Sequence, residues 1–110
     1  MTRYVNTALG SSMLPDGALR IHTLDADAAR AWLDAAPFRN VCNPMHANTL
    51  DAFSRALGRD LRVAEGGRVR LIAGDGCLVL EVSGLPRETR EFRDEEVAAA
   101  RFLFRLVEVG

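Results

Sequence analysis

A histidine beside the start of an expected helix is the strongest candidate for chemistry in this sequence. His46 follows an Asn-Pro-Met turn and precedes a stretch, from Leu50 to Leu57, in which apolar residues recur at helical spacing. A helix N-terminus disfavours positive charge, so an imidazolium there can donate its proton to a leaving oxygen. The simpler interpretation, which the residues alone favour, is that His46 caps the helix or packs beside Leu50.

The sequence gives little support for a metal site or for a site that binds nucleoside triphosphates. Cys42 and His46 are four residues apart, with Cys77 and His22 elsewhere, whereas structural zinc sites usually show paired ligands at each end. We therefore expect no metal and two simply buried cysteines. The Gly10-Ser11-Ser12 stretch lacks the lysine and the following helix of a phosphate-binding loop.

Charged and polar side chains that could bind a phosphate are scattered along the chain. A run of alternating arginines and glutamates follows Pro86, and such a run is usually a solvated loop. In the functional interpretation, an arginine of this run binds a phosphate and a glutamate orients a sugar hydroxyl. The further candidates are Arg68 and Arg70 and, near the end of the first expected strand, the uncharged donors Asn6, Thr7, Ser11 and Ser12.

The hydrophobic pattern predicts the elements that must position these residues. Strands are expected over 4–9, 19–23, 68–73, 77–82 and 102–109, and helices over 27–35, 46–57 and 94–100, with a loop over 38–45. Asp25 is the expected N-cap of the first helix, and Gly58 the residue that ends the second. Leu19, Ile21 and Thr23 alternate with polar residues, which is typical of a half-buried strand. The order β-β-α-α-β-β-α-β predicts one α+β domain over residues 1–110, with a mixed sheet of about five strands and flanking helices.

Composition narrows the class of protein. The chain has 110 residues, 14 basic against 15 acidic, and a net charge of -1. This balance argues against a protein that binds duplex nucleic acid by neutralising many phosphates. No apolar run approaches the ~20 residues that span a bilayer, and the start lacks a secretory signal. With two cysteines and no disulfide framework, we expect a cytoplasmic domain that contacts no membrane.

Three blocks of the sequence together follow the pattern of one family. The first block is the opening strand Tyr4–Leu9 with its asparagine. The second is the segment Pro44–Thr49, whose His-x-x-Thr motif begins a helix that ends at Leu57-Gly58. The third is the second half of the chain, from Arg68 through the strand Leu78–Val82 to Glu88 and Glu95-Glu96. In these blocks the chain resembles the small viral type III anti-CRISPR ring nucleases and their cellular relatives, formerly a domain of unknown function from archaeal viruses. The likeness covers nearly the whole chain.

The resemblance implies a two-fold homodimer that cleaves cyclic oligoadenylates, cyclic tetra-adenylate above all, without metal or cofactor. In that family a ribose 2′-OH attacks the adjacent phosphate and leaves a 2′,3′-cyclic phosphate end. Carried over by position, His46 is the general acid and Glu88 a carboxylate in the ribose site. The substrate-binding residues that follow are Asn6, Thr7, Ser11, Ser12, Arg68 and Arg87.

The chain also departs from the family pattern. Met45 stands where the family usually has glycine. Around its glutamate the family usually has Arg-Leu followed by an acidic residue and glycine, whereas this chain has Gly84-Leu85-Pro86-Arg87-Glu88-Thr89, so that the arginine is missing or displaced to Arg87. Glu81 replaces a glutamine and adds a negative charge. These changes keep two alternatives open: a module that sequesters a cyclic nucleotide without cleaving it, and a small structural or regulatory dimer.

Overall fold

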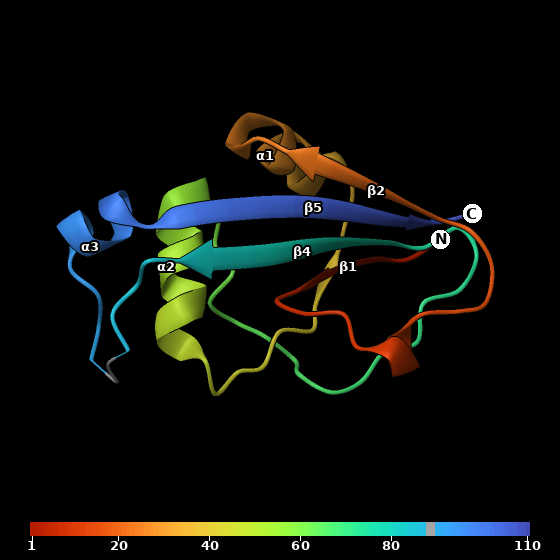
Figure 1. The fold of residues 1–110 in the computed structure, drawn as a ribbon, viewed down its shortest axis with the longest axis horizontal. Coiled ribbons are helices and arrows are strands. Elements are labelled where there is room, and N and C mark those ends of the chain that lie inside the picture. Colours follow the sequence, from red (N-terminus) through yellow and green to blue (C-terminus); the bar gives the residue numbers. More distant parts are fainter. Residues whose placement is uncertain (88–89) are drawn as a thin grey trace.

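The computed structural model describes residues 1–87 and 90–110. In chain order the elements are β1 (Arg3–Asn6), the 3₁₀ helix η1 (Ser11–Met13), β2 (Leu19–Leu24), α1 (Ala26–Ala35), β3 (Arg39–Asn40), α2 (Ala47–Leu57), β4 (Gly76–Ser83), α3 (Asp94–Ala99) and β5 (Arg101–Val109) (Figure 1). The predicted α+β class is confirmed.

The strands form one mixed sheet in the order β2-β5-β4-β1-β3. β1 lies parallel to both β3 and β4, and β5 lies antiparallel to both β2 and β4. The five-stranded mixed sheet expected from the sequence is therefore confirmed.

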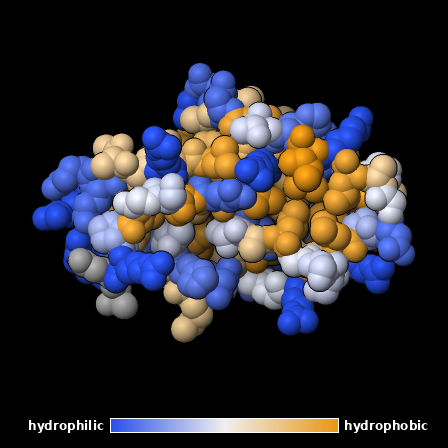
Figure 2. All heavy atoms as spheres, in the orientation of Figure 1, coloured by the Kyte–Doolittle hydropathy of each residue, from blue (hydrophilic) through white to orange (hydrophobic). Residues whose placement is uncertain are grey.

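The two faces of the sheet are covered differently. On one face, α1 and α2 bury Leu33, Leu50 and Phe53 against strand residues that include Val5 and Leu78. On the other face, Leu71 from the long connection between α2 and β4 packs with residues of β1, β4 and β5. Figure 2 shows apolar side chains gathered on the half of the molecule near the termini, whereas the end that carries α3 is hydrophilic.

α2 forms as its spacing predicts. Leu50, Phe53 and Leu57 are all at most 1% exposed, and burying each such side chain contributes about 1.5–3 kcal/mol. Gly58 ends the helix with φ 66°, and its N–H donates to the carbonyl of Ser54 at 2.9 Å. The burial fixes the rotation of the helix and therefore the direction in which its first turn faces.

The predicted strand over 68–73 is wrong. β4 already pairs with β1 on one side and β5 on the other, so its ladder has no place for that segment. The segment instead lies over the sheet: Leu71 is fully buried and its N–H donates to the carbonyl of Met13 at 2.9 Å. The turn after it is closed by Asp75, whose carboxylate accepts the N–H of Ile72 at 3.0 Å.

Three smaller predictions also need correction. The segment 38–45, expected to be all loop, contains the two-residue strand β3, which is too short to show a periodicity. β1 ends at Asn6 and not at Leu9, because the Asn6 side chain accepts the N–H of Thr7 at 2.8 Å and closes the strand. Ile21 is 61% exposed and not half-buried, because β2 lies at the sheet edge.

Asn40 joins β3 to the long connection that follows α2. Its side chain is buried and donates to the carbonyls of Leu61 and Val63 at 2.9 and 3.2 Å. Its side-chain oxygen accepts the N–H of Cys42 at 3.2 Å. A segment without regular structure is thus held by an amide that satisfies three backbone groups.

We predict that Asn40→Ala lowers the free energy of unfolding by about 2–4 kcal/mol, since it leaves buried backbone groups without partners. Asn43→Ala is the control, because it removes an exposed hydrogen bond to the N–H of Met45. The control should cost at most about 1 kcal/mol. Urea denaturation measures both, and equal small losses would contradict the role given to Asn40.

Candidate functional site

The difference in length between β1 and β4 opens a step at one side of the sheet. Asn6, the last residue of β1, pairs with Val79, whereas β4 continues to Ser83. Among the described residues, no strand pairs with Leu80–Ser83 on the β1 side. Figure 1 shows β1 ending well before β4 crosses α2. The first turn of α2 and the connection from β4 to α3 lie toward the end of the molecule that β1 does not reach (Figure 1).

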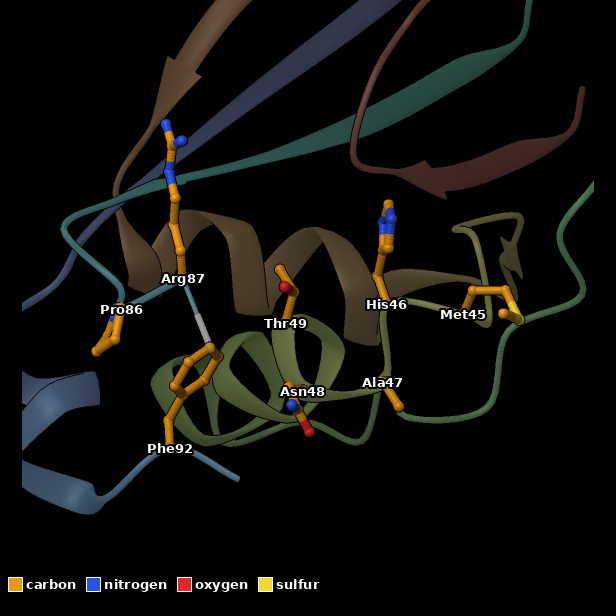
Figure 3. A pocket seen from close by; sticks show the side chains of 8 residues that line it. All are labelled: Met45, His46, Ala47, Asn48, Thr49, Pro86, Arg87 and Phe92. Atoms are coloured by element: carbon orange, nitrogen blue, oxygen red, sulfur yellow. The ribbon is translucent and has the colours of Figure 1, made fainter. Parts of the chain in front are cut away.

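A cleft of about 670 Å³ lies between these two segments. The α2 side supplies Met45, His46, Ala47, Asn48 and Thr49, and the connection supplies Pro86, Arg87 and Phe92. In Figure 3 the side chains of His46, Thr49 and Arg87 project to the same side, toward the strands, whereas Ala47 and Asn48 project the other way. The cleft thus holds an imidazole, a hydroxyl and a guanidinium on walls from separate parts of the chain.

His46 is the N-cap residue of α2, but its imidazole makes no capping hydrogen bond. The backbone of His46 makes the hydrogen bonds at the start of the helix. Its N–H donates to the carbonyl of Asn43 and its carbonyl accepts the N–H of Leu50, both at 3.0 Å. The residue is exposed, whereas Leu50 is fully buried. The imidazole therefore does not cap the helix, and it is not buried with Leu50.

The turn before His46 is held by close packing of a proline ring on a glycine. Pro44 packs on Gly66, where a side chain's Cβ would lie 2.9 Å from the proline Cδ. Gly66 also has φ 71°, a conformation that favours glycine. Cys42, just before the turn, is buried, and its N–H donates to the side chain of Asn40. Leu50, in the helix that follows the turn, is also buried, so the chain is anchored on both sides. The start of α2 is consequently fixed in place.

Arg87 supplies the cationic group of the opposite wall. It is exposed, and the described residues offer it no ion pair. The other arginines of the same run are engaged within the protein: Arg90 binds Glu96 through two hydrogen bonds of 2.7 and 2.8 Å, and Arg93 lies 3.4 Å from the same carboxylate. The hydrogen bond from Arg90 is the main cause that lowers the pKa of Glu96 to about 2. Arg87 is therefore the arginine of this run that faces the cleft.

The other predicted site residues lie outside the lining of the cleft. Asn6 and Thr7 stand at the end of β1, Ser11 and Ser12 are exposed on η1, and Arg68 is exposed on the long connection. Glu88 lies outside the described residues. Of the predicted site residues that are described, the cleft brings together His46 and Arg87.

Sequence reasoning did not single out Asn48 or Phe92, which also line the cleft. Phe92 is only 6% exposed, so it forms part of the floor where the connection meets α2. No pattern in the sequence marks it, because its neighbours come from distant segments.

The two cysteines are free, buried and on different sides of the sheet. Burial is the main cause that raises the pKa of Cys42 to about 11 and that of Cys77 to about 12. Within residues 1–87 and 90–110, no three His, Cys, Asp or Glu side chains are grouped so that they could hold a metal ion. The cysteines therefore belong to the core and not to the cleft.

We predict that both thiols react slowly with a disulfide reagent at pH 8 in the folded protein. Because the pKa of each thiol is raised, little thiolate is present at pH 8, and burial slows the reaction further. Unfolding the chain in guanidinium chloride should release both thiols to rapid reaction. A fast reaction of either thiol in native buffer would contradict this assignment to the core.

Comparison with known proteins supports the fold. No protein-family model matches the chain, and neither does any curated protein sequence. Among solved structures, B116 of Sulfolobus turreted icosahedral virus matches with a TM-score of 0.78. The match covers 98% of this chain and 99% of that chain at 18% sequence identity. No described helix is both long and apolar enough to cross a membrane. The chain thus shares the fold of an archaeal virus protein along its whole length.

Proposed function

We propose that this protein is a metal-independent ring nuclease that degrades cyclic oligoadenylates, the second messengers of type III CRISPR immunity. The observation that carries the proposal is the cleft in which His46 and Arg87 stand on separate walls. His46 belongs to one block of the family resemblance. Arg87, some forty positions later in the sequence, stands beside Glu88 of another block and is taken as the displaced family arginine. The fold shared with an archaeal virus protein agrees with the viral side of that resemblance.

The proposed reaction needs one proton donor at the leaving group. A ribose 2′-oxygen attacks the neighbouring phosphorus, the bond from phosphorus to the 5′-oxygen breaks, and a 2′,3′-cyclic phosphate forms. The 5′-alkoxide is a poor leaving group, so donation of a proton from the His46 imidazolium lowers the barrier. His46 suits this role because its ring is exposed in the cleft and carries no capping bond. In this proposal Glu88 orients the attacking 2′-hydroxyl.

Binding needs only a few cationic contacts because the ligand is small. Arg87 supplies one charge-assisted contact to a phosphate, and the N-terminus of α2 favours negative charge nearby. The remaining proposed contacts, from Asn6, Thr7, Ser11, Ser12 and Arg68, lie outside the cleft of one chain. A two-fold homodimer, which would present two copies of each residue to one ring, accommodates them.

Two other functions remain to be separated by experiment. A module that sequesters a cyclic nucleotide would use Arg87 for binding and leave the ligand intact. A structural or regulatory dimer would neither bind nor cleave it. Incubation with labelled cyclic tetra-adenylate distinguishes the three functions by cleavage, by retention without cleavage, or by neither.

We predict that His46→Ala lowers the single-turnover rate of cyclic tetra-adenylate cleavage about 10²–10⁴-fold, the usual contribution of general acid catalysis. Affinity should stay within a few fold, and a chelator should leave the wild-type rate unchanged. The matched control is His22→Ala, which removes the other histidine, an exposed side chain 3.1 Å from Glu108 on the sheet. It should cleave at the wild-type rate.

A folded His46→Ala variant that cleaves as fast as wild type would contradict the assignment. Circular dichroism measures the fraction of folded protein. If the activity of His46→Ala falls only in proportion to that fraction, His46 contributes to stability and not to the reaction.

We predict that Arg87→Ala weakens binding of cyclic tetra-adenylate by about 1.5–3 kcal/mol, as expected for a charge-assisted contact to a phosphate. Titration calorimetry in the His46→Ala background measures this without cleavage, and should give one ring per two chains. Arg20→Ala is the control, because Arg20 is exposed on β2 and does not line this cleft. If both substitutions change the affinity equally, Arg87 is a solvated surface residue that does not bind the phosphate.

A further inference from the structure

The wall of the cleft that carries Arg87 belongs to a connection, residues 84–93, that has no regular secondary structure in its described part. Arg90 attaches this connection to both α3 and α2. Its guanidinium binds both carboxylate oxygens of Glu96, at 2.7 and 2.8 Å, in the parallel geometry that gives such pairs their directional strength. Glu96 also accepts the N–H of Arg93 at 2.9 Å, and its side chain is only 12% exposed. Arg90 is thus fixed to the first turn of α3.

The same residue is fixed to α2 through its backbone. The side-chain amide of Asn48, one position before Thr49 in the first turn of α2, donates to the carbonyl of Arg90 at 2.8 Å. We call Arg90, Glu96 and Asn48 the Arg90 clasp. It joins the helix start that carries His46 to the connection that carries Arg87.

A second attachment lies further along the connection and does not involve Arg90. The guanidinium of Arg55 donates to the carbonyl of Phe92 at 2.7 Å, and the Phe92 ring is buried with Ala52 and Val97. Arg90→Ala breaks the bonds to Glu96. The Phe92 attachment and the Asn48 bond to the backbone carbonyl of residue 90 should then still hold the connection on α2. Removing the Arg90 side chain should therefore loosen the wall of the cleft without unfolding the domain.

The short length of chain between Arg90 and Arg87 limits the distance between their backbones. Three residues of extended chain span at most about 11 Å, so an anchored Arg90 limits where the Arg87 backbone can stand. Arg90 itself does not line the cleft. Its effect on a ligand must then pass through the residues that do.

We infer that Arg90 is a positioning residue for ligand binding: its clasp with Glu96 and Asn48 sets the place of Arg87 opposite His46. The inference rests on the proposed function, since it takes Arg87 to bind a phosphate of the ring. It assigns Arg90 no contact with the ligand.

A double-mutant cycle of Arg90→Ala and Arg87→Ala, with cyclic tetra-adenylate as the probe, tests the inference. In the otherwise wild-type chain, Arg90→Ala should raise the dissociation constant about tenfold. In the Arg87→Ala chain the same substitution should change it less than twofold, because the group that Arg90 positions is gone. The single-turnover rate at saturating ligand should fall less than threefold, since His46 stays in place. Independent, additive effects would overturn the inference.

Two comparisons separate positioning from a general loss of stability. Arg59→Ala is the matched control: Arg59 binds Asp34 with two hydrogen bonds of 2.8 and 2.6 Å at the other end of α2, and its side chain is 41% exposed against 40% for Arg90. It should leave the dissociation constant unchanged. Arg90→Lys should restore part of the affinity, because lysine keeps the charge but not the paired geometry. Equal losses in Arg59→Ala and Arg90→Ala would overturn the inference.

Hydrogen exchange without ligand gives an independent test. In Arg90→Ala, a peptide that spans the connection between β4 and α3 should exchange faster than in wild type, whereas peptides of β4 and β5 should not change. Unchanged exchange in the connection would overturn the inference even if the protein binds the ring. If wild-type protein neither binds nor cleaves cyclic tetra-adenylate, the proposed function fails and the ligand-binding role of Arg90 fails with it. The exchange result then still shows whether Arg90 holds the connection.

Discussion

The end of β1 at Asn6 limits how far the sheet extends toward the candidate site (Figure 1). The Asn6 side chain takes the next backbone N–H, so the parallel ladder with β4 ends at Val79 while β4 runs on to Ser83. The cleft lies between the first turn of α2 and the connection that follows β4, toward the end of the molecule that β1 does not reach (Figure 1).

The walls of the cleft are placed by packing and not by local preference. α2 is rotated by the burial of Leu50, Phe53 and Leu57, and its start is held by the Asn43 turn and by Pro44 against Gly66. The opposite wall has no helix or strand of its own and depends on side chains that reach across it. One wall is therefore held by a helix packed on the core, whereas the other is held by the buried Phe92 ring and a few polar contacts.

The elements with strong periodicity could be predicted from the sequence, and those defined by tertiary pairing could not. Asp25 caps α1, Gly58 ends α2, and both helices agree with their expected ranges. The segment around Leu71 has the composition of a strand, but composition cannot show that β1 and β5 already occupy both sides of β4. For the same reason His46 and Arg87 could be proposed from the sequence, whereas Phe92 lines the cleft because it packs on Ala52 of α2, far from it in the sequence.

The central claim is that the cleft breaks a phosphodiester by attack of the neighbouring 2′-hydroxyl, with His46 as proton donor. Mass spectrometry of the products formed from cyclic tetra-adenylate by wild-type protein tests this most directly. The account predicts linear or shorter oligoadenylates that end in 2′,3′-cyclic phosphate and begin with a 5′-hydroxyl. Products that carry a 5′-phosphate and a free 3′-hydroxyl would require attack by water at the opposite bond, and would contradict the account.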